Sequence, residues 1–147
     1  MLHLAKACES LKVRAVIRVA FYSGMRMSEI LGAKIVKDYF YLEDTKNGQP
    51  RYVPIHPKIR TAIRHMAVPR GTMKYHFLKA RRKAEMDWFN FHDLRHSAAS
   101  ELRNQGVDLH MVGGVLGHKS SQSTQRYAHI APKTLIDVVA KIGKKAA

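Results

Sequence analysis

The chain has little cysteine, few acidic residues and no long apolar run. Its single cysteine, Cys8, excludes an internal disulfide framework and a cysteine-rich zinc site, and it suits a reducing compartment. No apolar stretch is long enough to span a bilayer, and the first residues lack the charged start and apolar core of a secretory signal. These absences predict an intracellular, cytoplasmic protein.

Acidic residues are strongly outnumbered: among 147 residues, 26 Lys and Arg stand against 11 Asp and Glu, for a formal net charge of +15. Because a compact domain gains nothing from so much repulsion, we expect a polyanionic partner, with nucleic acid as the first candidate. An anionic membrane surface is a weaker alternative, since the basic residues are spread over many segments rather than along one amphipathic helix. A basic domain without such a partner is the remaining alternative.

Apolar periodicity predicts one mainly α-helical domain with a small antiparallel β-sheet near its start. Residues 39–43 and 51–55 are rich in Val, Ile, Tyr and Phe and flank Asn47-Gly48, a strong turn signal, so they are predicted to form a hairpin. Residues 34–36 are a candidate third strand, and two prolines place 51–55 at an edge. Helices are predicted over residues 2–11, 13–22, 26–32, 57–67, 71–86, 91–106, 109–117, 124–130 and 133–143.

The helix predicted over residues 91–106 begins with an unusual concentration of charge. His92 and Arg95 are three residues apart and share one helix face, whereas Leu94, Ala98 and Leu102 share another face that can pack inward. The helix N-terminus also has partial positive charge and unpaired backbone donors. An Arg fork and a His that titrates near neutral pH at this place suit a phosphate group.

Two other interpretations of this helix start remain open. His92 and His96 are four residues apart, as in a two-histidine metal pair, but Asp93 and Leu94 follow the first histidine where an H-E-x-x-H site has Glu. The second interpretation is a solvated basic helix end without a ligand.

Four further stretches each contain one residue of chemical interest. "SGMRMSEIL" contains Arg26 with Glu29 one turn later, and Glu29 can hold the guanidinium or its supporting backbone. "TKNGQPRYVP" places Lys46 at a hairpin tip, "LGHKSS" places His118 after a helix-ending glycine, and "STQRYAHI" contains Tyr127. Taken singly, these residues favour structural interpretations: a surface ion pair for Arg26 and Glu29, a solvated lysine, a helix-capping histidine and a half-buried tyrosine.

Together and in this order, the five stretches resemble the catalytic domain of the tyrosine recombinases, the phage integrase family. That family's pattern is an arginine, a hairpin lysine, H-x-x-R, a second histidine or tryptophan, and a tyrosine. The resemblance extends from about residue 13 to residue 142. It implies a mainly helical catalytic domain with a small antiparallel sheet, the DNA breaking–rejoining fold.

The resemblance implies that DNA is cut and rejoined through a covalent 3′-phosphotyrosyl link. Tyr127 would be the nucleophile, and two arginines would clamp the phosphoryl oxygens. Histidines would move a proton and donate to a nonbridging oxygen, and a lysine would protonate the leaving 5′ oxygen. The implied catalytic set is Arg26, Lys46, His92, Arg95, His118 and Tyr127, with Glu29, Asp93 and His96 as supports.

The resemblance also implies partners and domain organisation. We expect double-stranded DNA and other protomers in a synaptic assembly as partners, a nucleoid-associated location, and no membrane, small-molecule substrate, metal or cofactor. Backbone phosphates would be contacted by the basic run Lys79, Arg81, Arg82 and Lys83. Residues 1–147 would form the catalytic domain, and the N-terminal DNA-binding domain usual in the family is expected to be absent from this chain.

Three alternatives stay open at this stage. A DNA-binding accessory module that has lost catalysis would bind DNA without forming an adduct. A type IB topoisomerase-like enzyme would relax supercoiled DNA without strand exchange. The amphipathic segment 133–143 can dock on a neighbouring protomer, as the last helix of the family often does, or pack within its own chain.

Overall fold

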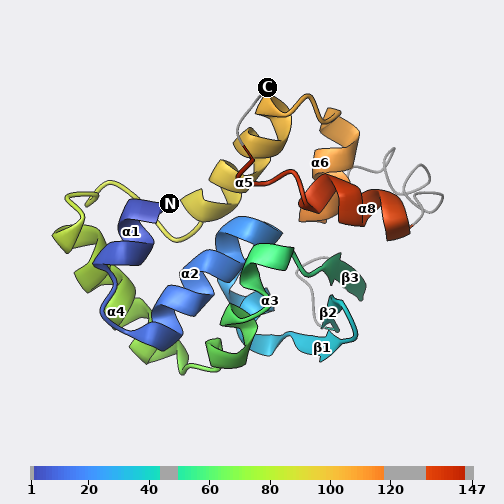
Figure 1. Ribbon diagram of the computed structural model, residues 1–147. Helices are drawn as coiled ribbons and strands as arrows, with labels where there is room; N and C mark the ends of the chain where they lie inside the picture. Colours follow the sequence, from blue (N-terminus) through green and yellow to red (C-terminus); the bar gives the residue numbers. More distant parts are fainter. Residues whose placement is uncertain (1, 44–49, 118–131, 145–147) are drawn as a thin grey trace.

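The computed structural model describes residues 2–43, 50–117 and 132–144. Three short strands are inserted into a mainly helical chain, and the sheet lies beside the helical body (Figure 1). The elements are α1 (Leu2–Ala7), α2 (Leu11–Ser23), α3 (Met27–Gly32), β1 (Lys34–Val36), β2 (Tyr39–Leu42), β3 (Arg51–Pro54), the 3₁₀ helices η1 (Pro57–Ile59) and η2 (Ala62–His65), α4 (Arg70–Lys83), α5 (Asp93–Asn104), α6 (Leu109–Leu116) and α8 (Pro132–Val139).

Helix α2 is the central element of the core. Ser10 caps its first turn by accepting a hydrogen bond from the amide of Val13 at 3.4 Å. Most side chains from Val13 onward are buried, and α2 packs against α5 and η2. The helix ends at Gly24, which adopts the left-handed conformation with a φ of 64°. The predicted helix stop at Gly24 is confirmed.

The sheet is antiparallel with the strand order β1-β2-β3. Phe40, Leu42 and Val53 are buried on its inner face, whereas Tyr41 and Tyr52 face each other on the outer side with ring centroids 5.0 Å apart. The three predicted strands and the edge position of β3 are confirmed. The predicted turn at Asn47-Gly48 lies outside the described residues.

The segment 57–67, predicted as one helix, forms the two short 3₁₀ helices η1 and η2 instead. Pro57 does occupy the first position, as expected. The buried side chains are Ile59 and Ala62, three residues apart. That spacing matches the three residues per turn of a 3₁₀ helix, so the tighter turn keeps both side chains against α2.

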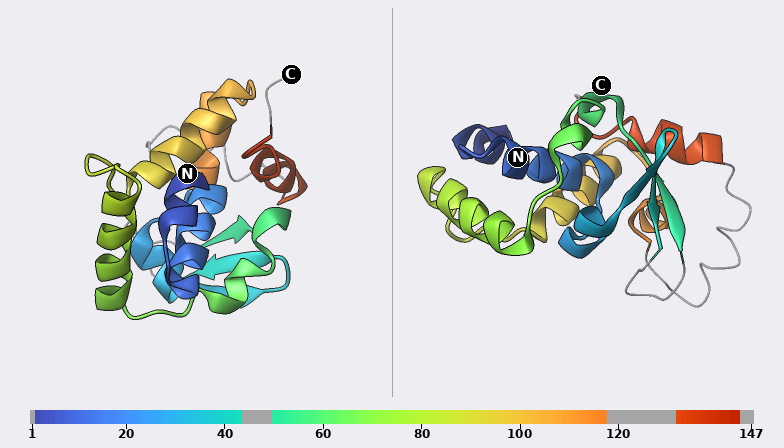
Figure 2. Two further views of the ribbon diagram at one scale, coloured as in Figure 1. Left: turned by 60° about the vertical axis from the view of Figure 1, so that its left-hand side comes forward. Right: turned by 90° about the horizontal axis from the view of Figure 1, so that it is seen from below.

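Helices α4, α5 and α6 were predicted close to their observed limits. α4 lies beside α1 in every view (Figures 1 and 2). α5 buries Leu94, Ala98 and Leu102 completely against α2 and α6, which confirms the predicted inner face. Asp108 caps α6 by accepting a hydrogen bond from the amide of His110 at 2.8 Å, also as predicted.

The last described helix, α8, packs within its own chain. It contacts α6 and β3, and Val138, Val139 and the following Ile142 are buried. The helix predicted over residues 124–130 lies outside the described residues. In the ranges given above, no helix is long and apolar enough to cross a membrane.

Candidate active site

The connection between α2 and α3 positions Arg26. Arg26 is the N-cap of α3, and the side chain of Glu29 turns back to it. Oε2 of Glu29 accepts from the backbone amide of Arg26 at 2.8 Å, and Oε1 accepts from Nη1 of Arg26 at 2.9 Å. The Glu29 side chain is 2% exposed and that of Arg26 is 22% exposed. Glu29 therefore holds both the backbone and the guanidinium of Arg26, while Arg26 keeps access to solvent.

Glu29 is ionised despite its burial. Burial alone raises the pKa of the Glu29 carboxyl. The positive charge of Arg51, the amide of Arg26 and the Arg26 guanidinium outweigh burial and hold this pKa below its usual range. A buried carboxylate with two arginine partners therefore lies at the start of α3.

Arg95 projects from the first turn of α5 into the space between the ends of two other helices. It is only 3% exposed. Nη1 donates to the carbonyl of Gly24 at the end of α2, and Nη2 donates to the carbonyl of Leu116 at the end of α6, both at 2.7 Å. Burial, followed by the charges of Arg26 and Arg51, lowers the pKa of Arg95 to about 10, so the guanidinium remains charged at neutral pH.

His92 lies at the N-cap of α5 with an exposed side chain. Desolvation of the ring, followed by the charges of His96, Arg95 and Arg26, lowers the pKa of His92, and Asp93 opposes this shift. The His92 and His96 rings are in edge-on contact, with centroids 4.8 Å apart. Oδ2 of Asp93 accepts from the amide of Asn90 at 2.6 Å and so fixes the start of α5.

The described part of the candidate site is thus a cluster of positive charge. Arg26 comes from the start of α3, and His92 and Arg95 come from α5, about seventy positions later in the sequence. The charges of Arg26 and Arg95 disfavour the imidazolium form of His92, and the charge of Arg26 disfavours that of Arg95. An anion placed among them would relieve this repulsion. The cluster is therefore suited to bind a phosphate group or another oxyanion.

Arg51, which the sequence interpretation did not select, belongs to the same cluster. Its guanidinium reaches Glu29 at 3.2 Å, and its charge acts on Arg95. The sequence does contain one indication of this inward orientation. Arg51 and Val53 are two residues apart in a strand, so they share one face of the sheet, and that face is the buried one.

Lys46, His118 and Tyr127 lie outside the described residues. The described residues that adjoin two of these segments lie beside the charged cluster. Arg51 follows the segment that contains Lys46, and Gly117 immediately precedes His118. A Cβ added to Gly117 would lie 2.7 Å from Nε of Arg51, so these two ends of the described chain are in direct contact.

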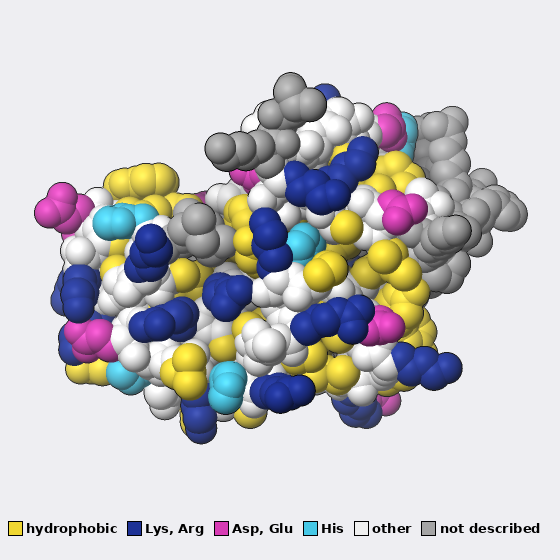
Figure 3. Space-filling model, in the orientation of Figure 1, with side chains coloured by type: hydrophobic (Ala, Val, Ile, Leu, Met, Phe, Trp, Pro, Cys, Tyr) yellow, Lys and Arg dark blue, Asp and Glu magenta, His cyan; other side chains and the backbone are white. Residues whose placement is uncertain are grey.

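Three residues of the basic run at the end of α4 already have partners. Nζ of Lys79 and Nζ of Lys83 both pair with Glu9, at 2.8 and 3.0 Å. Arg81 donates to the carbonyl of Phe89 at 3.3 Å. Arg82 is exposed. Figure 3 shows Lys and Arg side chains spread over this face of the molecule, with few Asp and Glu among them.

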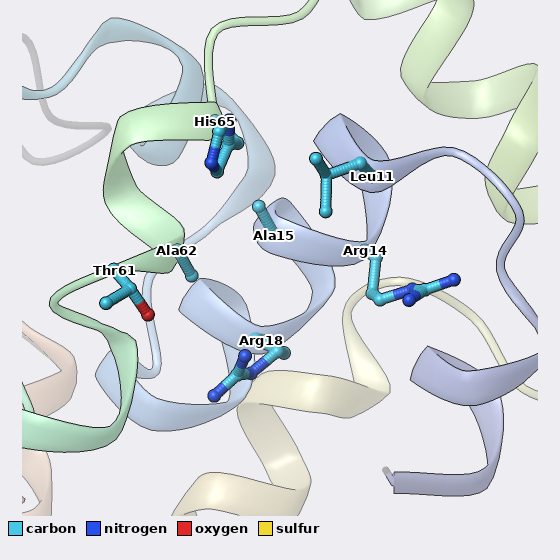
Figure 4. Close-up of a pocket in the computed structure, with 7 residues that line it drawn as sticks. All are labelled: Leu11, Arg14, Ala15, Arg18, Thr61, Ala62 and His65. Carbon is cyan, nitrogen blue, oxygen red and sulfur yellow. The ribbon is translucent and has the colours of Figure 1, made fainter.

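A pocket of about 220 Å³ lies between the first half of α2 and η2, at the opposite end of α2 from Gly24. Two arginines, Arg14 and Arg18, line the pocket (Figure 4). Both are held by backbone carbonyls: Arg14 donates to that of Cys8 at 2.7 Å, and Arg18 donates to that of Lys58 at 2.6 Å. This pocket shares no residue with the charged cluster. In the ranges that the structure describes, no group of three or more His, Cys, Asp or Glu is arranged to hold a metal ion.

A family model and the curated relatives of this chain point to the same family. Residues 67–134 match the model of the Phage integrase family. The tyrosine recombinase XerC of Corynebacterium glutamicum is 28% identical over 164 residues, which covers 94% of this chain and 53% of the relative. The chain spans about half the length of the curated relatives it matches.

Solved structures show the same fold. An integrase from mycobacterium phage Brujita superposes with a TM-score of 0.76 at 19% identity, covering 96% of this chain and 55% of that chain. A lambda integrase dimer bound to a COC′ core site gives a TM-score of 0.66 at 22% identity, covering 89% and 59%. The mainly helical fold with its small antiparallel sheet is therefore that of the recombinase catalytic domains. The family match over residues 67–134, together with the XerC and XerA relatives, supports the tyrosine recombinase family for this chain.

Proposed function

We propose that residues 1–147 form the catalytic domain of a site-specific DNA recombinase that cuts and rejoins strands through a 3′-phosphotyrosyl intermediate. The observation that carries this proposal is the cluster of Arg26, His92 and Arg95, in which Arg26 at the start of α3 acts electrostatically on both His92 and Arg95 of α5. A solvated basic helix end would not have a buried guanidinium that is bonded to two other helices.

The proposed reaction conserves the phosphodiester. The phenolic oxygen of Tyr127 attacks the scissile phosphorus, the bond from phosphorus to the 5′ oxygen breaks, and a 5′-hydroxyl leaves. A 3′-phosphotyrosyl ester remains on the protein. Rejoining is the reverse step, with a 5′-hydroxyl as the nucleophile. Since the number of ester bonds is unchanged, the reaction needs no nucleotide.

Arg26 and Arg95 have complementary properties for stabilising the transition state. Arg95 is fixed by its bonds to Gly24 and Leu116, which take two of its five N–H groups. Arg26 is fixed through Glu29 but stays partly open to solvent. Preorganised donors of this kind stabilise the charge that develops on nonbridging oxygens, and loss of one typically costs on the order of 10²–10³ in rate.

His92 is suited to accept the tyrosine proton. A free phenol has a pKa of about 10, so Tyr127 needs a base to become an effective nucleophile. The lowered pKa of His92 keeps its imidazole neutral near pH 7, the form that can take up a proton. His118 would donate to a nonbridging oxygen, and Lys46 would protonate the leaving 5′ oxygen.

We propose double-stranded DNA and further protomers as the partners. Two lambda integrase neighbours are a dimer bound to a COC′ core site and a tetramer bound to a Holliday junction. The net charge of +15 on this chain also supports binding to a polyanion such as DNA. Exposed Arg82 and the lysines of α4 would contact backbone phosphates.

A suicide-substrate assay tests the proposed function. The chain is incubated with a pool of duplexes that have randomised sequence around a nick, so that the cleaved fragment diffuses away and the adduct accumulates. We expect a protein–DNA band on a denaturing gel that is absent for Tyr127→Phe. Arg26→Ala should form it about 10²–10³ times more slowly. Retention on DNA without any adduct would instead identify an accessory DNA-binding module.

A further inference from the structure

Arg51 lies where the hairpin strand, the start of α3 and the end of α6 meet. It is the first residue of β3 and pairs with Leu42 of β2. Leu42 is buried, and cross-strand partners share a face of the sheet, so the side chain of Arg51 points inward. The side chain is 18% exposed, which is low for an arginine.

Two acceptors on different elements hold the Arg51 guanidinium. Nη2 donates to Oε2 of Glu29 at 3.2 Å, and Nη1 donates to the carbonyl of Val115 at 2.8 Å. Oε2 of Glu29 also accepts from the amide of Arg26. One carboxylate is therefore shared between Arg51 and Arg26, and a change at Arg51 reaches Arg26 through this oxygen.

The end of α6 is built around the same guanidinium. Val115 and Leu116 are consecutive residues of the last turn, and their carbonyls accept from Arg51 and Arg95 respectively. These carbonyls are the negative end of the helix dipole, where cations are stabilising. Gly117, with a φ of 68°, passes so close to Arg51 that a Cβ would lie 2.7 Å from Nε and 2.8 Å from Cζ.

We propose that Arg51 is a positioning residue for the strand-cleavage reaction. It orients Glu29, and through Glu29 it sets the position of Arg26. It also fixes the end of α6, from which the chain continues directly to His118. This inference rests on the proposed function, because only the reaction makes the placement of Arg26 matter. A lysine cannot replace Arg51, since a single ammonium lacks the planar fork that spans both acceptors.

Cleavage kinetics separate positioning from DNA binding. Arg51→Ala and Arg51→Lys are compared with the wild type and with Arg18→Ala, a matched control whose guanidinium also donates to a backbone carbonyl, that of Lys58. We expect both Arg51 variants to bind DNA as the wild type does and to form the adduct about 10–100 times more slowly. The Arg18→Ala variant should retain the wild-type rate.

Two further readouts exclude a merely structural effect. A methylphosphonate at the scissile position removes the charge that Arg26 and Arg95 clamp, so the Arg51→Ala defect should shrink on that substrate. Combining Arg51→Ala with Glu29→Gln should slow cleavage no further than the stronger single change, because both act on the same carboxylate. Fully additive defects, or equal defects on both substrates, would overturn the inference.

One measurement does not depend on activity. The Arg26 amide proton, bonded to Glu29, should exchange with solvent faster in Arg51→Ala than in Arg18→Ala. If the wild type forms no adduct, the proposed function fails, and this measurement alone decides whether Arg51 positions Glu29. Equal exchange rates in the two variants would contradict the inference.

Discussion

At the scale of single residues, His92 combines an exposed imidazole with a lowered pKa. Desolvation and the nearby charges of His96, Arg95 and Arg26 all disfavour the imidazolium form. Because the folded-state pKa lies below its usual value of about 6.5, the neutral form persists to lower pH than in a free histidine. A base of this kind remains competent under mildly acidic conditions.

The acid limb of the rate of adduct formation should therefore have its midpoint below about pH 6.5, the usual value for a histidine. The acid limb reports protonation of the base, and His92→Ala should slow cleavage and remove this limb. Single-turnover rates from pH 5 to 8 check this, with circular dichroism to show that the protein stays folded throughout. A midpoint above pH 6.5, or an acid limb unchanged in His92→Ala, would argue against His92 as the base.

At the scale of elements, the approach of α2 to α6 depends on Gly24. Its φ of 64° is strained for other residues, and an added Cβ would lie 2.4 Å from Cδ2 of Leu116. The carbonyl oxygen of Gly24 also accepts a hydrogen bond from the guanidinium of Arg95. The junction of the two helices therefore supports the buried guanidinium as well as the packing.

Substituting Gly24 should destabilise the protein through two separable causes. We expect Gly24→Ala to lower the free energy of unfolding by about 2–4 kcal/mol, from backbone strain and overpacking together. Gly106→Ala isolates the strain, since φ is 72° and nothing lies nearby, and should cost about 1–2 kcal/mol. Gly71→Ala, in open space in α4, should be neutral or stabilising. Urea unfolding measures all three, and a Gly24→Ala cost no larger than that of Gly106→Ala would rule out the clash.

At the scale of the whole molecule, positive charge dominates, yet part of it is neutralised internally. Glu9 pairs with Lys79 and Lys83 across the contact of α1 with α4. These hydrogen bonds, followed by the lysine charges, lower the pKa of Glu9 to about 2. A depressed carboxyl pKa means that the pairs are intact above the unfolded-state pKa and are lost as the pH falls towards 2. At neutral pH, two lysines of the proposed DNA surface are therefore partly neutralised.

Removing this internal competitor should strengthen DNA binding. We expect Glu9→Gln to bind more tightly and to steepen the dependence of log K on log salt by about 1–2, since each added phosphate contact contributes about 0.9. Asp38→Asn is the matched control, because it removes the same charge beside Arg60, away from α4. Fluorescence anisotropy at several salt concentrations measures both variants. Identical salt dependences would show that Lys79 and Lys83 do not contact the phosphates.

Features that depend on local spacing could be predicted from the amino-acid sequence. Helix limits at Gly24 and Asp108, the inner face of α5 and the strands that flank the hairpin follow from residues a few positions apart, whose backbone and periodic preferences act within one element. The segment 57–67 departs from its pattern because packing on α2 selected a tighter turn. Of the expected site, the pairing of Arg26 with Glu29 was visible in the same way.

Which charged groups lie together depends instead on the packing of distant segments. Arg95 bonds to Gly24, 71 positions away, and Arg51 bonds to Val115, 64 positions away. Glu9 neutralises lysines 70 and 74 positions away. No local pattern encodes such pairs, because electrostatic and hydrogen-bond energies depend on distance in space, and only the packing of the helices and the sheet sets that distance.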